Sequence, residues 1–163
     1  MPYVIVIYDS KTGNTEKMAK AVVEGAELVK DVTVTLLKVG SPFSISKLNT
    51  ADAIILGSPT RYGNVTSEMK EFLDAVKEHV DSKKLKLSEK IGGVFASYAW
   101  DGGWVTSILE RTMNALGIHL ITSSVSAVDN MGAMGIRINE ETLQKCKDLG
   151  KDVAQKIGGK LAN

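Results

Sequence analysis

Apolar runs rich in β-branched residues alternate with amphipathic stretches along the chain, and this alternation restricts the folds that the sequence can adopt. The runs expected to form strands are Tyr3–Tyr8, Val32–Leu37, Ala53–Leu56, Ile91–Ala96 and Leu120–Ser124. Most of them are apolar at nearly every position, as in parallel strands that helices cover on both faces. Strands alternating with helices predict an α/β fold with a doubly wound parallel sheet.

Between these runs, apolar residues recur at the spacing of one helix face. The stripes are Met18, Val22, Ala26 and Val29; Met69, Phe72, Val76 and Val80; Val105, Ile108, Leu109, Thr112 and Leu116; and Leu143, Cys146, Leu149, Val153 and Ile157. Gly117 is placed to end the third helix and Asn139 to cap the fourth. Residues 40–50 are expected to form only a turn of helix around Ile45 and Leu48.

Right-handed crossovers limit five such strand–helix units to a few topologies. We expect the five-stranded order 2-1-3-4-5, with helices on both faces of the sheet. The sequence shows no internal repeat, low-complexity tract or long linker, so we expect one domain over residues 1–163.

The composition argues against several classes of protein. Twenty basic and 19 acidic residues give a formal net charge of +1, which provides no electrostatic reason to expect nucleic acid or an acidic membrane as partner. No segment approaches the roughly 20 apolar residues that span a bilayer. A single cysteine, Cys146, excludes an internal disulfide and fits a reducing compartment. We therefore expect a soluble cytoplasmic protein, with its oligomeric state open.

Three loops of unusual composition follow the first, third and fourth predicted strands. They are Ser10–Thr15, the stretch "SPTRYGN" at Ser58–Asn64, and "SYAWDGGW" at Ser97–Trp104. In the order 2-1-3-4-5 these three strands are neighbours. Ligands of open α/β sheets bind at the carboxyl ends of the strands, so we expect the three loops to meet at one binding site.

The first loop suits a phosphate group. It precedes a helix, whose first N–H groups and positive dipole end attract anions. Ser10, Thr12, Asn14 and Thr15 add side-chain donors, and Gly13 permits a tight bend. The alternative is a helix start with extra capping residues.

The sequence of this first loop does not match the other phosphate-binding motifs that occur between a strand and a helix. The Walker pattern requires Lys-Ser/Thr after its second glycine, but Gly13 is followed by Asn14-Thr15. No G-x-G-x-x-G follows the first strand. A receiver domain needs an acidic cluster at the ends of the first and third strands, but the third strand leads into Gly57-Ser58. A phosphatase with a cysteine nucleophile would place its thiol in the first loop, whereas Cys146 lies on the last predicted helix.

The other two loops suit a flat aromatic ligand, because aromatic faces stack on planar rings and glycines let the backbone approach closely. The aromatic residues are Tyr62, Tyr98, Trp100 and Trp104, and the glycines are Gly63, Gly102 and Gly103. Core packing is the alternative for each aromatic, most of all for Trp104, which opens a predicted helix.

Ser10-Lys11-Thr12-Gly13-Asn14-Thr15 resembles the [Ser/Thr]-x-Thr-Gly-Asn-Thr phosphate loop of flavodoxins, and the resemblance covers essentially the whole chain. It implies a flavodoxin-like fold and non-covalently bound FMN, with the other two loops flanking the isoalloxazine ring. The implied cofactor-binding residues are Ser10, Lys11, Thr12, Gly13, Asn14, Thr15, Ser58, Pro59, Thr60, Arg61, Tyr62, Gly63, Asn64, Ser97, Tyr98, Ala99, Trp100, Asp101, Gly102 and Gly103.

The later loops resemble two subfamilies. "SPTRYGN" is similar to the "PTR[Phe/Tyr]GN" loop of WrbA-type quinone reductases, and "SYAWDGGW" is similar to the third loop in the flavodoxin domain of A-type diiron flavoproteins. The chain has only His79 and His119, too few for a diiron centre, and we expect no metal site. It also lacks room for the insertions of WrbA-type enzymes, and its net charge departs from the acidic flavin face of typical flavodoxins.

The resemblance implies roles for single residues. Lys11 is expected to point outward as a solvated charge, whereas Arg61 either faces the ring edge or is a surface charge. A carbonyl near Gly63 is expected to accept a hydrogen bond from the reduced ring. A bond worth about 1 kcal/mol shifts a one-electron couple by about 40 mV, so Gly63→Val is predicted to alter the potentials. The orientation of Asp101 is left open.

Three functions remain. The first is an FMN protein that passes electrons between redox partner proteins, with no catalytic side chain of its own. The second is an NAD(P)H-dependent quinone or flavin reductase, which the "PTRYGN" loop favours and the compact chain disfavours. The third is a non-redox binding module on the same fold.

Overall fold

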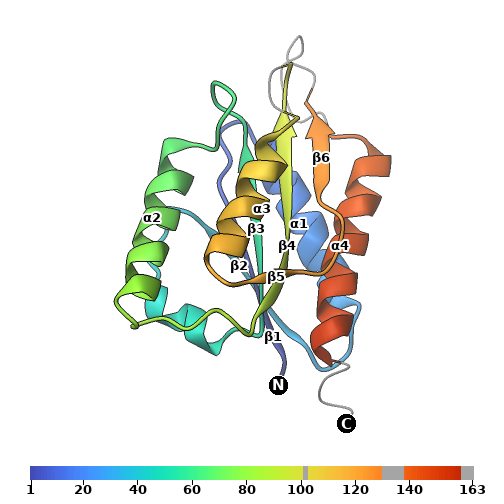
Figure 1. Cartoon of the computed structure of the whole chain (residues 1–163). Coiled ribbons are helices and arrows are strands. Elements are labelled where there is room, and N and C mark those ends of the chain that lie inside the picture. Colours follow the sequence, from blue (N-terminus) through green and yellow to red (C-terminus); the bar gives the residue numbers. More distant parts are fainter. Residues whose placement is uncertain (101–102, 130–137, 159–163) are drawn as a thin grey trace.

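The computed structural model describes residues 1–100, 103–129 and 138–158, and its centre is a parallel sheet (Figure 1). The strands are β1 (Tyr3–Tyr8), β2 (Thr33–Lys38), β3 (Ala53–Pro59), β4 (Ile91–Tyr98), β5 (His119–Leu120) and β6 (Val125–Val128). The order is β2-β1-β3-β4-β5, with β6 also paired to β4. Every pairing is parallel, which confirms the predicted order.

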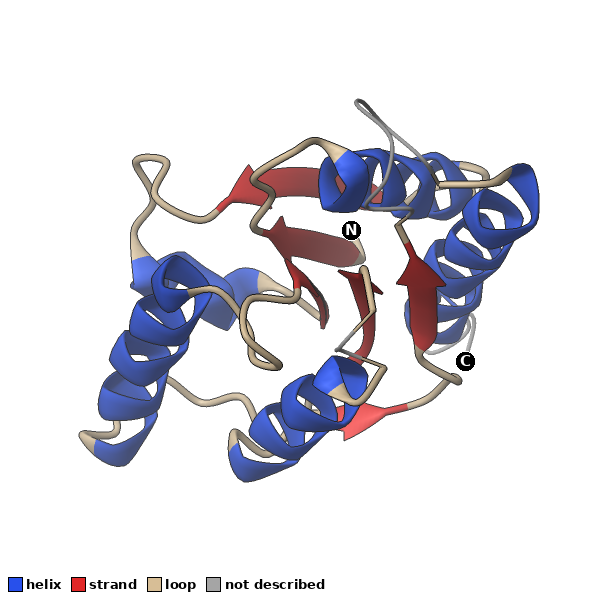
Figure 2. Cartoon of the chain, turned by 90° about the horizontal axis from the view of Figure 1, so that it is seen from above, coloured by secondary structure: helices blue, strands red, loops and turns tan. Residues whose placement is uncertain are grey.

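Helices cover both faces of the sheet, as predicted (Figure 2). They are α1 (Asn14–Glu27), α2 (Ser67–Asp81), α3 (Val105–Ala115) and α4 (Glu140–Gly158), with the short 3₁₀ helix η1 (Ile45–Thr50). One apolar core joins the sheet to α1 and α4, and a second joins it to α2, α3 and η1. Among the described helices, none is long and apolar enough to cross a membrane.

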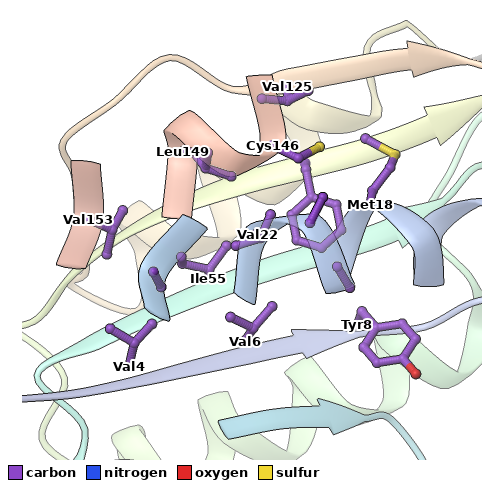
Figure 3. Packing of buried hydrophobic residues seen from close by; sticks show 14 of the residues in the cluster. Val4, Val6, Tyr8, Met18, Val22, Ile55, Val125, Cys146, Leu149 and Val153 are labelled. Carbon is purple, nitrogen blue, oxygen red and sulfur yellow. The ribbon is translucent and has the colours of Figure 1, made fainter. Parts of the chain in front are cut away.

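The core under α1 and α4 contains the single cysteine. Figure 3 shows Cys146 near Met18 and Val125, above the strands that carry Val6 and Ile55. Burial raises the pKa of the Cys146 thiol to about 12. A thiol held in its neutral form among apolar side chains is a packing group, which agrees with its place in the apolar stripe.

Two predicted helix ends are confirmed. Gly117 follows α3 with a left-handed φ of 84°. Asn139 caps α4, because its Oδ1 accepts a hydrogen bond of 2.8 Å from the backbone N–H of Thr142.

The predicted fifth strand, Leu120–Ser124, is wrong. β5 ends at Leu120 and β6 begins at Val125, so the fifth sheet position holds two short segments. The residues between them leave the ladder, and the Ser124 hydroxyl instead donates to the Glu110 carboxylate of α3. The apolar pattern did not reveal this interruption because it records burial and not hydrogen-bond partners.

Strands β3 and β4 continue further than predicted. Gly57 pairs with Phe95, Ser58 with Ala96 and Pro59 with Ser97, although the predicted strands ended at Leu56 and Ala96. The ladder continues through small and polar residues because both neighbours are already aligned. Ser58, Pro59 and Ser97 are therefore buried strand residues and not loop residues.

Helices α1 and α4 cross with their backbones nearly touching. A Cβ atom at Gly25 would lie 1.9 Å from the carbonyl oxygen of Lys147, and one at Gly150 would lie 1.9 Å from the carbonyl oxygen of Val22. No real Cβ atom tolerates such a distance. The two glycines thus set the separation of α1 and α4, and this separation was not predicted from the sequence.

We predict that Gly150→Ala destabilises the protein, because the added methyl group must push α1 and α4 apart. Overpacking of this kind typically costs about 1–3 kcal/mol, measured here as a loss of unfolding free energy in urea. Gly158→Ala is the matched control on the same helix, since the described residue nearest to its Cβ would be Val29, with Cγ1 at 4.0 Å. Equal stabilities of the two variants would contradict a rigid crossing.

Candidate functional site

The loops after β1, β3 and β4 meet at the carboxyl edge of the sheet, as predicted, at the end towards which the strand arrows point in Figure 1. The hydroxyl oxygens of Thr15 and Ser97 are 2.8 Å apart. The Thr60 hydroxyl donates to the carbonyl oxygen of Ser97 at 3.0 Å. The indole Nε1 of Trp104 donates to the carbonyl oxygen of Gly63 at 2.7 Å. Polar contacts therefore connect the first and second loops to the end of β4 and to the loop that follows it.

The first loop folds around the Ser10 side chain. Its Oγ accepts hydrogen bonds of 3.2 Å from the backbone N–H groups of Gly13 and Glu16. Gly13 has φ 98°, a conformation that disfavours any residue with a side chain, and α1 begins directly after it. The result is a tight turn in front of a helix.

Two backbone N–H groups of this turn are available to bind a ligand. Among the described residues, none accepts a hydrogen bond from the backbone N–H of Thr12 or Thr15. The Asn14 amide donates to Thr12 Oγ1 at 3.3 Å and to Asp129 Oδ2 at 3.5 Å. Hydroxyls, backbone N–H groups and the positive end of the α1 dipole thus converge, which is the chemistry that binds a phosphate.

Asp9 is a site residue that the sequence analysis missed. Its carboxylate is 2% exposed and accepts from the Ser10 N–H at 2.8 Å and from the Thr66 hydroxyl at 2.5 Å. Thr66 in turn caps α2 by accepting from the Met69 N–H at 3.2 Å. Asp9 therefore attaches the end of β1 to the start of α2. The signal available in the sequence was an acidic residue directly after an apolar strand.

Lys11 extends the same connection at the surface. It is solvent-accessible, as expected, but it is ion-paired: its ammonium lies 2.6 Å from Glu68 Oε1 and 3.7 Å from Asp9 Oδ2. The hydrogen bond from Lys11 lowers the pKa of Glu68 to about 2, and the same bond raises the pKa of Lys11. Both partners are solvated, so the pair adds little to stability.

The second loop is a two-residue hairpin. The Arg61 and Asn64 backbones exchange hydrogen bonds of 2.8 and 3.0 Å. Tyr62 and Gly63 between them have φ values of 51° and 73°, the pattern of a type I′ turn. The Tyr62 side chain is 101% exposed. The turn therefore presents an uncovered aromatic ring beside the first loop.

Exposed aromatic surface is concentrated at this edge. Of the six large hydrophobic side chains that are exposed among the described residues, Tyr62, Trp100, Trp104 and Val128 lie on its loops or strand ends. Surface of this kind marks a site for an apolar partner or ligand. Val128, at the end of β6, was not predicted.

The other residues predicted to bind the cofactor differ in how far they are exposed to solvent. Ser58, Pro59 and Ser97 are buried, and the Ser58 hydroxyl is engaged because it donates to the Pro59 carbonyl and accepts from the Thr66 N–H. Tyr98 and Ala99 are half-buried, and Gly103 is exposed. Asp101 and Gly102 lie outside the described residues. In the part of the chain that the structure describes, no group of His, Cys, Asp or Glu side chains is arranged to hold a metal ion.

A donor-rich turn with exposed aromatic rings beside it, on a 2-1-3-4-5 sheet, is the arrangement of a flavodoxin-like α/β protein. The family model described as Flavodoxin matches residues 6–157. The chain therefore belongs to the flavodoxin family of electron-transfer proteins, and this membership implies a flavin cofactor.

Individual relatives agree with this assignment. A flavodoxin of Aquifex aeolicus (strain VF5) is 33% identical over 95% of this chain and 86% of its own length. An NAD(P)H dehydrogenase (quinone) of Archaeoglobus fulgidus is 32% identical over 95% of this chain and 97% of its own. The solved structure of a flavodoxin from the domain Archaea superposes with a TM-score of 0.79 at 29% identity, covering 96% of this chain and 99% of that one.

We predict that Trp104→Phe loosens the turn at Tyr62–Gly63, because phenylalanine retains an aromatic ring but cannot donate to the Gly63 carbonyl. The backbone N–H groups of Arg61 and Asn64 should exchange with solvent several-fold faster, as expected for losing a bond worth about 1 kcal/mol. Hydrogen exchange followed by NMR measures this. Trp100→Phe is the control, since Trp100 donates no hydrogen bond to any described residue; equal effects would contradict the prediction.

Proposed function

We propose that the flavin is FMN, bound non-covalently, and that the protein carries electrons between redox partner proteins. The observation that carries this proposal is the turn before α1, where the backbone N–H groups of Thr12 and Thr15 have no acceptor among the described residues. A dianionic phosphate is the flavin substituent that such a site favours. Riboflavin lacks this group.

Each residue of the turn has a definite part in this proposal. Thr12 and Thr15 offer their backbone N–H groups to the phosphate, and Thr12 also offers its exposed hydroxyl, whereas the Thr15 hydroxyl is engaged with Ser97. Ser10 shapes the loop, and its hydroxyl hydrogen is still available because Oγ accepts in both of its contacts. The helix dipole of α1 adds an attraction of about 0.3–1 kcal/mol for an anion.

Tyr62 and Trp100 are the candidates to contact the flavin ring. Both are largely exposed, at 101% and 76%, so a planar ligand can cover them without displacing the core. Offset stacking of two rings adds about 0.5–1.5 kcal/mol beyond the buried area. The flavin supplies the redox chemistry, and the protein supplies binding, orientation and shielding from water.

A nicotinamide-dependent quinone reductase is the second candidate. The Archaeoglobus fulgidus relative carries that name, and this chain matches 97% of its length. The alignment nevertheless spans 187 positions, more than the 163 residues of this chain, so the relative contains insertions that this chain lacks, and the compact chain still disfavours a reductase. The carrier and the reductase share the flavin site and differ in whether a nicotinamide reaches it.

We predict that Thr12→Val weakens FMN binding while leaving riboflavin binding unchanged. Losing one hydrogen bond to a charged group costs about 1.5–3 kcal/mol, or about 10- to 150-fold in Kd, measured by quenching of flavin fluorescence. Thr33→Val is the matched control, because Thr33 is also exposed but lies on β2. Equal weakening for FMN and riboflavin would place the phosphate elsewhere.

We also predict that the FMN-loaded protein is reduced by dithionite but not within minutes by NADH or NADPH. Visible spectra under argon measure this, since the yellow absorbance disappears on reduction. Rapid bleaching by a nicotinamide would contradict the carrier and favour the reductase. A colourless protein that ignores added FMN would favour the non-redox module.

A further inference from the structure

A continuous groove runs from the candidate site along the face of α2 and α3. Its upper part, about 570 Å³, lies between the first two loops and the start of α2. Its lower part, about 480 Å³, lies between α2 and α3. Asn64, Val65 and Lys70 line both parts. We call the whole feature the α2–α3 groove.

The floor of the lower part is apolar and its rim is polar. Leu73 and Leu116 lie buried at its base, with Ile108 half-buried beside them. Val65 continues this surface into the upper part. Apolar floors with charged rims are typical of protein–protein contact surfaces.

The rim carries more positive than negative charge. Five cations line the groove, namely Lys11, Arg61, Lys70, Lys77 and Arg111, against two carboxylates, Glu68 and Asp74. The three lysines are balanced by neighbours, because Lys11 pairs with Glu68, Lys70 with Asp74 and Lys77 with Asp81.

The two arginines are different. Neither Arg61 nor Arg111 forms an ion pair with any described residue, and both are exposed. Among the described residues, the Arg61 guanidinium donates only to the carbonyl oxygen of Thr60, at 3.3 Å. Two guanidinium groups with unused donors thus stand at the two ends of the groove, and such groups bind carboxylates through paired hydrogen bonds.

The groove is also continuous with the proposed flavin site. Tyr62 and Asn64 belong to the I′ turn and line the groove as well. A protein seated in the groove would therefore contact the turn that borders the flavin site. This is the position that short-range electron transfer between two proteins requires.

We propose that the α2–α3 groove is the docking surface for a redox partner protein whose contact surface is acidic, with carboxylates meeting Arg61 and Arg111. The proposal rests on the electron-carrier function proposed above. Opposite charges across an interface raise the association rate, and salt screens this effect.

Two protein acceptors of opposite charge test the proposal. The FMN-loaded protein is reduced with dithionite and mixed in a stopped-flow instrument with a rubredoxin, a small acidic iron protein, or with cytochrome c, which is basic. We expect the second-order rate constant for rubredoxin to fall as salt increases from about 0.02 to 0.5 M, and that for cytochrome c to lack this fall. A rubredoxin rate that rises with salt would overturn the proposal.

A charge-matched pair of variants locates the surface. Arg111→Glu and Lys151→Glu each take the formal net charge from +1 to −1, but Lys151 is exposed on α4, on the opposite face of the sheet. Arg111→Glu should lower the rubredoxin rate about fivefold or more at low salt, and Lys151→Glu less than twofold. Equal effects of the two variants would overturn the proposal. Arg111→Gln provides a milder second variant if the reversal impairs folding.

The flavin spectrum separates the two proposals. If the wild-type protein binds no FMN, the carrier function fails, and the docking proposal that rests on it fails with it. If both variants bind FMN with the wild-type spectrum and are reduced normally, any difference in rate arises at the docking step.

Discussion

The parallel pairing of β1 with β3 and of β3 with β4 is the constraint on which the candidate site depends. The registers align Tyr8 with Gly57 and Pro59 with Ser97, so three strands end within a few residues of one another. Each strand must then reverse direction through a loop at the same edge. Three segments that are far apart in the sequence become neighbours for this reason alone, before any ligand is considered.

Hydrogen bonds from polar side chains near the strand ends then fix the conformation of the three loops. Asp9 joins the first loop to α2, Thr15 meets Ser97, and Trp104 holds the turn at Gly63. Within the described residues, every buried side-chain nitrogen and oxygen atom has a hydrogen-bond partner. A site whose loops are already fixed loses less conformational entropy when it binds, which favours affinity for a small ligand.

The sequence was informative wherever the deciding signal was local. Apolar periodicity predicted the strands and helices, the right-handed crossover rule limited the sheet order, and the glycine and hydroxyls of residues 10–15 predicted the turn before α1. Contacts between distant segments were not predictable in this way. The Asp9–Thr66 bond, the indole of Trp104 on Gly63 and the interruption after Leu120 each depend on which side chains the finished fold brings together.

The balanced net charge of +1 conceals an uneven surface. Each lysine that lines the α2–α3 groove forms an ion pair with a carboxylate, whereas neither Arg61 nor Arg111 forms one with any described residue. One two-residue turn, Tyr62–Gly63, borders both the proposed flavin site and the proposed docking groove. Trp104 of the third loop donates to Gly63 in that turn, so a partner bound in the proposed groove would contact a turn that is fixed from the other side of the proposed flavin site. In the two proposals, cofactor binding and partner docking therefore share this turn and the hydrogen bond from Trp104 that fixes it.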